Sequence, residues 1–180
     1  MKLLFASDIH GSLTYCQKLY AQIEKESPDK IVLLGDLLYH GPRNDLPLGY
    51  APKKVIPLLN SLSKHIIAVR GNCDAEVDQM VLDFPCMADY TTIVTDTGKV
   101  IFATHGHLMT PENHSAASAF DAFISGHTHI KQAYRNATYL VVNPGSVSIP
   151  KDDSHSYATF TNNIFSLKDL SGNIIDEVTF

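Results

Sequence analysis

Seven side chains that can bind a metal ion follow short apolar runs of the sequence, each close to the point where a predicted strand ends. They are Asp8, His10, Asp36, Asn72, His105, His127 and His129. In open α/β sheets, ligand sites lie beyond the carboxyl ends of the strands. One fold can therefore bring these oxygen and imidazole donors to one edge of the molecule.

Seven donors exceed what one catalytic metal needs, because such sites usually keep three protein ligands and an open position. Two adjacent cations that share one carboxylate fit the number better, and Asp36 is the candidate for that carboxylate. Two cations about 3.5–4 Å apart are a common arrangement for hydrolytic displacement at phosphorus. The ligands are expected to be nitrogen and oxygen, since the three cysteines are widely spaced and form no Cys-x-x-Cys pair.

The first half of the chain reads as strands that alternate with helices. An apolar strand over 2–7 is followed by a helix with Ser12 as its N-cap, which ends near Ser27, and then by a strand over 30–34. Residues 40–52 hold three prolines and two glycines, which predicts a long ordered loop. A helix over about 53–63, a strand over 66–69 and a further helix capped by Asp74, carrying Val77, Met80, Val81 and Leu82, complete this part.

After residue 90, strands dominate. Segments 91–95 and 100–104 flank a turn as in a hairpin, and further strands are predicted over 123–125, 139–142, 157–160, 164–167 and 174–180. This order of elements favours a layered α/β domain with two packed sheets between helices. We expect one domain over residues 1–180.

Five motifs in order carry a resemblance to a known family. They are Asp8-x-His10, Gly35-Asp36, Gly71-Asn72, His105-Gly106-His107 and Gly126-His127-Thr128-His129. Together they resemble the signature of the calcineurin-like metallophosphoesterase superfamily, and within it the small bacterial and archaeal phosphodiesterases of the YfcE type. The resemblance implies a four-layer α/β/β/α sandwich.

The resemblance also implies a ligand set and a mechanism. One metal would be held by Asp8, His10, Asp36 and His129, and the second by Asp36, Asn72, His105 and His127. The family favours Mn²⁺, with Fe, Zn²⁺ or Ni²⁺ as alternatives. A metal-bound hydroxide would attack the phosphorus of a small phosphodiester, while Asn72, His107 and Arg70 help to stabilise the phosphoryl oxygens.

One motif position departs from the commonest family pattern. Many members read Gly-Asn-His-Asp/Glu, where the histidine is thought to protonate the leaving group, but this chain has Gly71-Asn72-Cys73-Asp74, as the YfcE-like branch does. A thiol matches neutral pH less well than an imidazole, so we expect weaker leaving-group catalysis. The alternative is that Cys73 is a small buried apolar residue.

Other candidate substrate contacts have simpler alternatives. His107 can serve only as a hydrogen-bonding neighbour of the site. Arg43, in the proline-rich loop, is better explained as a solvated side chain than as a contact to substrate or to a second subunit. Tyr50 and His114 are further candidates for substrate specificity.

Net charge and hydropathy limit the classes of partner that we expect this protein to bind. A formal net charge of −5 argues against long nucleic acids and anionic membranes. No apolar run approaches the roughly 18 residues of a membrane span, so we expect a cytoplasmic enzyme. The family suggests a homodimer. The alternatives are a phosphomonoesterase, a nuclease for short oligonucleotides, or a non-catalytic scaffold like the retromer-type sorting subunit, although all seven ligand positions are filled here.

Overall fold

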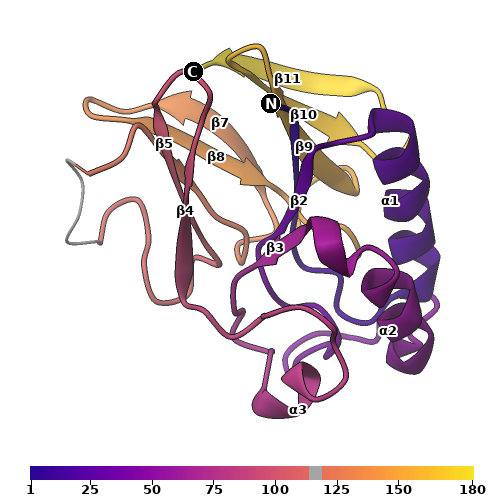
Figure 1. Ribbon diagram of the computed structural model, residues 1–180. Helices are drawn as coiled ribbons and strands as arrows, with labels where there is room; N and C mark the ends of the chain where they lie inside the picture. The colour runs from indigo at the N-terminus through magenta and orange to yellow at the C-terminus, as the bar shows by residue number, and fades with distance from the viewer. Residues whose placement is uncertain (114–118) are drawn as a thin grey trace.

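The computed structural model describes residues 1–113 and 119–180, which form two mixed β-sheets (Figure 1). The six-stranded sheet has the order β11 (Ile174–Thr179), β10 (Ile164–Asp169), β9 (Ser156–Thr161), β1 (Leu3–Ala6), β2 (Lys30–Leu33), β3 (Ile66–Ala68). The five-stranded sheet has the order β4 (Tyr90–Val94), β5 (Val100–Thr104), β6 (Ala122–Ile124), β8 (Leu140–Pro144), β7 (Lys131–Arg135). The predicted fold class, an α/β sandwich with two packed sheets, is confirmed.

Each sheet contains three adjacent parallel strands, which in the six-stranded sheet extend to its edge at β3. β1, β2 and β3 run parallel, as do β5, β6 and β8. Antiparallel strands flank them: β9 beside β1 in one sheet, and β4 and β7 at the edges of the other. The carboxyl ends of the parallel strands therefore meet at one edge of each sheet.

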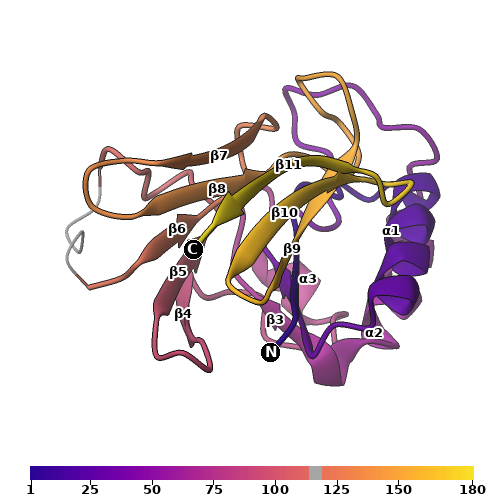
Figure 2. The same cartoon turned by 90° about the horizontal axis from the view of Figure 1, so that it is seen from above.

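Two helices cover the outer face of the six-stranded sheet (Figures 1 and 2). α1 (Leu13–Glu26) begins where predicted, because the Ser12 hydroxyl accepts a hydrogen bond from the backbone N–H of Tyr15, and it ends at Ser27 in a left-handed conformation. α2 (Pro52–Asn60) follows the proline-rich loop and is continued by the 3₁₀ turn η1 (Ser63–His65).

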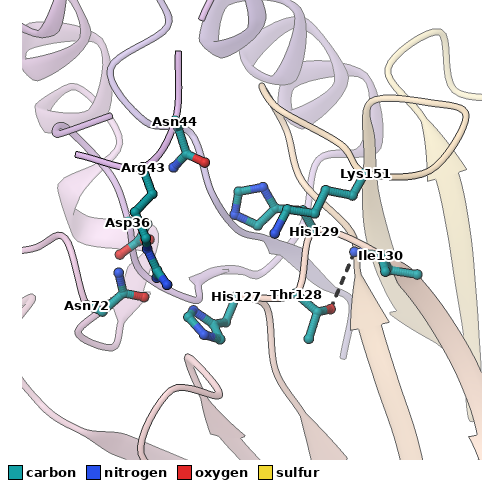
Figure 3. A pocket seen from close by; sticks show the side chains of 9 residues that line it. All are labelled: Asp36, Arg43, Asn44, Asn72, His127, Thr128, His129, Ile130 and Lys151. Atoms are coloured by element: carbon teal, nitrogen blue, oxygen red, sulfur yellow. Dashed lines mark hydrogen bonds between the residues drawn. The ribbon is translucent and has the colours of Figure 1, made fainter. Parts of the chain in front are cut away.

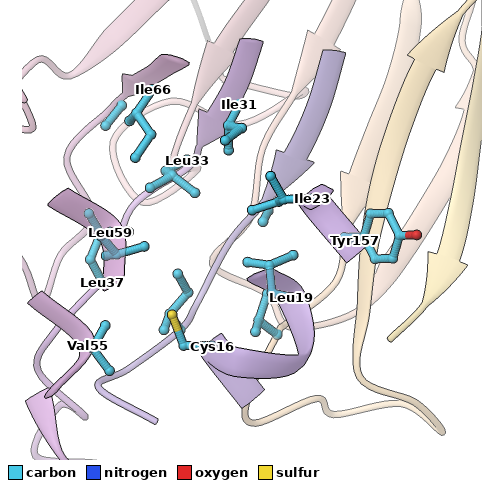
Figure 4. Packing of buried hydrophobic residues seen from close by; sticks show 14 of the residues in the cluster. Cys16, Leu19, Ile23, Ile31, Leu33, Leu37, Val55, Leu59, Ile66 and Tyr157 are labelled. Carbon is cyan, nitrogen blue, oxygen red and sulfur yellow. The ribbon is translucent and has the colours of Figure 1, made fainter. Parts of the chain in front are cut away.

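The core is divided by the side chains that alternate along each strand. Leu4 and Ala6 of β1 face the helices, where they belong to the same buried cluster as Leu19, Ile23 and Leu59 (Figure 4). Leu3 and Phe5 face the five-stranded sheet and join its Ile101, Ile124 and Val142. Burial on both faces explains why the parallel strands are continuously apolar in sequence.

The outer face of the five-stranded sheet carries a separate, largely aromatic cluster. It consists of Phe102, Phe120, Phe123, Tyr139 and Val141, with the partly buried Val100 and Met109 packed against it. Met109 and Phe120 come from the connection between β5 and β6. These two residues therefore help to cover the sheet on the side opposite to the helices.

Two elements differ from prediction. The helix expected after Asp74 is only the four-residue α3 (Glu76–Gln79), and its N-cap is Ala75 rather than Asp74. The prediction was wrong because Val77 and Met80, which are 60% and 83% exposed, have no core to pack against. β7 was missed because its sequence, Lys-Gln-Ala-Tyr-Arg, lacks the apolar alternation of a half-buried strand.

None of the helices in residues 1–113 and 119–180 has the length and apolar character needed to span a bilayer.

Candidate metal centre

The loops that follow the parallel strands of both sheets meet at one site. Asp8 and His10 follow β1, and their backbone N–H groups donate to the carbonyls of Gly35 (3.1 Å) and Asp36 (2.9 Å) after β2. In the other sheet, the N–H of Gly126 after β6 donates to the carbonyl of His105 after β5 (2.9 Å). Within each sheet, the neighbouring loops are thus tied together by backbone hydrogen bonds.

Five of the predicted donors have a left-handed backbone. Their φ angles are +60° for Asp8, +47° for His10, +55° for Asp36, +65° for His127 and +62° for His129. Such conformations cost non-glycine residues on the order of 1–3 kcal/mol each and cluster at functional sites. The backbone strain therefore coincides with the residues that the sequence singled out.

Three of the histidines are oriented in the same way. The Nδ1 atoms of His10, His105 and His129 lie 2.8, 2.6 and 2.7 Å from the backbone carbonyl oxygens of Tyr39, Leu34 and Ile149, respectively. A carbonyl oxygen only accepts, so each Nδ1 carries the proton. The lone pair of a neutral ring is then on Nε2, which is the usual arrangement of a metal-binding histidine.

The Nε2 atoms face two buried carboxylates. The distances are 3.2 Å from His129 to Oδ1 of Asp8, 3.6 Å from His10 to the same oxygen, 3.6 Å from His10 to Oδ2 of Asp36, and 3.5 Å from His105 to that oxygen. Oδ2 of Asp36 thus lies close to both His10 and His105, which come from different predicted ligand sets. The structure therefore places it between the two predicted ligand sets.

Two of these atoms are buried without a hydrogen-bond partner: Oδ1 of Asp8 and Nε2 of His10. An unpartnered buried polar atom is costly unless something else binds it. Carboxylate oxygen and imidazole nitrogen are ordinary ligands of divalent transition metals. The residues thus fit a bound cation on the chemistry of the donors and on their unsatisfied atoms.

Charge and burial compete in setting the pKa values of these groups. Burial alone would raise the pKa of Asp8, but the adjacent imidazoles of His10 and His129 and the charge of His105 outweigh burial and lower the pKa. Burial alone would lower the pKa of His105, whereas its hydrogen bond to Asp36 and the charges of Asp8 and Asp36 raise it to about 9. A cation among these groups would replace the protons that the imidazoles otherwise attract.

The remaining predicted ligands lie beside His105. Oδ1 of Asn72 is 3.1 Å from Nε2 of His105, and the ring of His127 is 5.0 Å from the ring of His105, centroid to centroid. The backbone N–H of His127 donates to Oδ2 of Asp8 (3.1 Å). All seven predicted donors thus converge.

Cys73 is part of this site and is half-buried, not enclosed in an apolar core. Its backbone N–H donates to Oδ1 of Asp36 (2.7 Å), and its sulfur accepts from Nδ2 of Asn72 (3.2 Å). Burial and the negative charge of Asp36 raise the pKa of the thiol to about 12. The thiol is therefore a weaker acid than a free cysteine.

Asp74 has a role that the sequence did not suggest. Its carboxylate accepts the backbone N–H groups of Asp36 (2.7 Å), Leu37 (2.8 Å) and Gly71 (2.8 Å). Gly71 lies so close to Asp36 that an added Cβ would stand 2.3 Å from its backbone nitrogen. Asp74 thus fixes the loop after β2 against the loop after β3. Gly71 permits this close approach because it has no Cβ.

Three further polar residues, which are not predicted ligands, stabilise the loops by hydrogen bonds to their backbone carbonyls. The hydroxyls of Ser146 and Ser148 both donate to the carbonyl oxygen of Asp8 (3.0 Å each), and Nδ2 of Asn143 donates to the carbonyl of Gly126 (2.8 Å). The only sequence signal for them was the polar segment that follows the strand over 139–142.

His107 and Arg70 lie beyond His105. The rings of His107 and His105 are 5.3 Å apart, and burial together with the charge of His105 lowers the pKa of His107. Nδ1 of His107 and Nε of Arg70 are buried without a hydrogen-bond partner. Both are thus close to the site with unsatisfied polar atoms.

A cavity of about 500 Å³ opens over the site (Figure 3). It is lined by Asp36, Arg43, Asn44, Asn72, His127, Thr128, His129, Ile130 and Lys151. Arg43 points into it, whereas Tyr50 lines a separate apolar groove, and His114 is outside the described residues. Lys151 and Asn44 carry no sequence signal of a site, because neither follows a predicted strand directly, and Thr128 lies within the histidine motif without being a candidate ligand.

The chain is similar to known phosphoesterases in both sequence and structure. The family model for the calcineurin-like phosphoesterase superfamily domain matches residues 1–163. Phosphodiesterase YfcE of Escherichia coli strain K12 is 46% identical over 168 residues, which cover 93% of this chain and 91% of YfcE. A solved structure of the E. coli phosphoesterase YfcE superposes with a TM-score of 0.93 at 44% identity and covers 99% of both chains.

More distant structures share the fold. A structure of an archaeal phosphodiesterase has a TM-score of 0.67 at 21% identity and covers 100% of both chains. Vps29 of Chaetomium thermophilum has a TM-score of 0.67 at 18% identity and covers 99% of this chain and 97% of its own. At these identities the likeness concerns the fold alone.

Proposed function

The chain belongs to the calcineurin-like phosphoesterase superfamily, and on that premise we propose that it is a metal-dependent phosphodiesterase with two adjacent cations. One cation is held by Asp8, His10, Asp36 and His129, and the other by Asp36, Asn72, His105 and His127. The substrate class is small phosphodiesters, as the name of the E. coli relative suggests.

The observation that carries this proposal is the common orientation of His10, His105 and His129. Their Nδ1 protons are given to backbone carbonyls, and their Nε2 atoms lie 3.2–3.6 Å from the carboxylates of Asp8 and Asp36. Hydrogen bonds alone leave Oδ1 of Asp8 and Nε2 of His10 unsatisfied. A cation bound between them satisfies both atoms.

The metal ions, when bound, would make a hydrolytic nucleophile available at neutral pH and act as Lewis acids on the phosphoryl group. The nitrogen and oxygen ligands suit Mn²⁺, with Fe, Zn²⁺ or Ni²⁺ as alternatives. Neither the number of ions nor their identity affects the orientation of the histidines, which the backbone carbonyls hold in place.

The remaining residues act on the substrate. Asn72 places an amide beside the phosphoryl oxygens, and Arg70 and His107 offer buried polar atoms without partners, which suits them to the charge that builds up on those oxygens. Arg70 has the planar fork that fits two phosphate oxygens. Cys73, next to Asn72, is placed to give a proton to the departing alcohol.

The experiment is a hydrolysis panel with the purified chain in Mn²⁺, using bis(p-nitrophenyl) phosphate, p-nitrophenyl phosphate, cyclic nucleotides and short oligonucleotides. We expect the diester to be hydrolysed best. Asp36→Asn and Asn72→Ala should each lower kcat/KM by at least about 100-fold. Asp45→Asn, which neutralises an exposed carboxylate in the proline-rich loop, is the matched control and should not.

Metal analysis separates this proposal from the scaffold alternative. We expect about two ions per chain in the Mn²⁺-loaded protein and fewer in Asp36→Asn. Less than one bound ion per chain, with no Mn²⁺-stimulated hydrolysis, would favour the scaffold. Full activity of both site variants would show that the ligand assignment is wrong.

A further inference from the structure

Two basic side chains line the cavity together with the predicted ligands. Arg43 comes from the proline-rich loop and Lys151 from the segment that follows β8, and Figure 3 shows them entering the cavity from opposite sides, with His129 between them. Neither is a predicted metal ligand. Neither forms an ion pair with a carboxylate of residues 1–113 or 119–180.

Hydrogen bonds fix the chain near Arg43 and near Lys151. The N–H of Lys151 donates to the carbonyl of His129 (2.9 Å), so its position is tied to a residue of the site. Asn44, next to Arg43, donates from Nδ2 to the carbonyl of His40 (2.8 Å), and Gly41 of the same turn packs near the sulfur of Cys73. The backbone of both residues is therefore tied to the region of the site, and their exposed side chains line the cavity.

The acidic neighbours of Lys151 are bound elsewhere. Asp152 and Asp153 follow it directly, but Nζ of Lys131 lies 2.6 Å from Oδ1 of Asp152 and 3.4 Å from Oδ1 of Asp153. Lys131 thereby pairs with both aspartates, and neither of them forms an ion pair with Lys151. The ammonium group of Lys151 is therefore available to a group in the cavity.

The charges expected at the site indicate what kind of group would bind to Arg43 and Lys151. Two dications and the carboxylates of Asp8 and Asp36 leave a net charge of about +2. A phosphodiester monoanion and a deprotonated nucleophile neutralise it. Arg43 and Lys151 then contribute two more positive charges that a simple diester does not balance.

The other lining residues at this end are small and polar. Asn44 and Thr128 offer an amide and a hydroxyl, and Ile130 is the single apolar residue among the nine that line the cavity. No aromatic ring other than imidazole is available for stacking a base there. Arg43 offers a guanidinium fork and Lys151 a point charge, beside the neutral donors of Asn44 and Thr128. These groups suit a tetrahedral oxyanion, which offers several acceptor oxygens.

We propose that Arg43 and Lys151 bind a second ionised phosphate of the substrate, so that the preferred substrates are phosphodiesters that also carry a phosphomonoester or diphosphate group. This inference rests on the proposed phosphodiesterase function and extends it to the substrate class. A cavity of about 500 Å³ is within the usual range for a ligand of this size.

The test compares two chromogenic esters that differ in one phosphate. They are thymidine 5′-(p-nitrophenyl phosphate) and the same compound with a 3′-phosphate. In Mn²⁺ at low ionic strength, we expect kcat/KM of the wild-type chain to be at least about tenfold higher for the 3′-phosphorylated ester. The advantage should shrink as salt is added, because the contacts are exposed.

The variants Arg43→Met, Lys151→Met and the double variant test the residues. The double variant should bring the ratio of the two kcat/KM values to within about twofold of one, mainly through KM. Lys25→Met, which removes one positive charge from the exposed last turn of α1, is the control and should keep the wild-type ratio. Arg43→Lys should recover only part of it, because the fork is lost.

Binding provides an independent measurement. Calorimetric titration of the Mn²⁺-loaded chain with thymidine 3′,5′-bisphosphate and with thymidine 5′-phosphate should give a lower Kd for the bisphosphate in wild type but not in the double variant. A wild-type ratio near one, or a ratio that survives in the double variant, would overturn the inference. Hydrolysis of neither ester by wild type would instead contradict the proposed function.

Discussion

Oδ1 of Asp8 and Nε2 of His129 lie 3.2 Å apart, although the two residues follow strands of different sheets. The same division holds for the whole donor set. Asp8, His10, Asp36 and Asn72 follow β1, β2 and β3 of the six-stranded sheet, whereas His105, His127 and His129 follow β5 and β6 of the other. A cation bound here would join the two sheets at one edge.

Metal removal is therefore expected to destabilise the chain as well as to inactivate it. A ligand present at 100 times its Kd contributes about 2.7 kcal/mol to the free energy of unfolding. For a chain of 180 residues, this corresponds to a fall in Tm of about 5–10 °C on chelation. Calorimetry with and without EDTA measures it. An equal fall in Asp36→Asn would show that the chelator acts elsewhere.

Asp74 should be a positioning residue. Asp74→Asn replaces one of the oxygens that accept the N–H groups of Asp36, Leu37 and Gly71 with an NH2 group, which donates and cannot accept. We expect a loss of about 1–3 kcal/mol of stability and at least a tenfold weaker affinity for Mn²⁺, measured by equilibrium dialysis.

The matched control for this change is Asp78→Asn. Asp78 is buried in the same segment and accepts one backbone N–H, that of Ala75 (2.8 Å), away from the donors. It should lose stability but keep its Mn²⁺ affinity. If both variants bound Mn²⁺ like wild type, Asp74 would be structural only.

Cys73 should matter only for poor leaving groups. Because burial and Asp36 raise the pKa of its thiol to about 12, the group stays protonated at neutral pH and can give its proton to a departing alkoxide. Cys73→Ala should lower kcat for an alkyl diester by about 10–100-fold, but by less than about threefold for bis(p-nitrophenyl) phosphate, whose leaving group needs no proton. Unchanged rates on both esters would exclude Cys73 as the donor.

Glu26 should set part of the acid stability, far from the metal centre. Its carboxylate is 2.7 Å from Nζ of Lys168 and 2.7 Å from Nζ of Lys2, and its side chain is 11% exposed. Burial alone would raise the pKa of Glu26, but the hydrogen bonds and charges of the two lysines lower it from 4.5 to about 2. Because the folded-state pKa is lowered, the stabilisation is present above about pH 4.5 and is lost as the pH falls toward 2.

This pH dependence can be measured by urea unfolding of the EDTA-treated protein between pH 2 and 7. The free energy of unfolding of wild type should exceed that of Glu26→Gln by roughly 1–3 kcal/mol at neutral pH, and the difference should vanish at the acid end. Glu24→Gln, on the exposed side of the same helix, should match wild type throughout. A constant difference at all pH values would contradict the ion-pair explanation.

The sequence predicted best those parts whose positions depend on local pattern. The donors after β1, β2, β5 and β6 could be found because apolar runs end at them, and Ser12 could be recognised as a cap from its place before a helical periodicity. Asp74 and Lys151 could not be assigned, since their roles depend on backbone groups far away in the sequence. The ion pair between Lys131 and Asp152 could not be predicted either, because β7 has no strand pattern in its sequence.

The left-handed backbone at five of the donor positions has a consequence for how such a chain can change. Glycine holds a positive φ without strain, so replacing His127 with glycine, for example, would remove a proposed ligand and relieve backbone strain of about 1–2 kcal/mol. In the metal-free chain, activity and thermostability are then opposed at the same positions. Selection for heat resistance of the metal-free chain, without a requirement for turnover, would be expected to erode the donor set first.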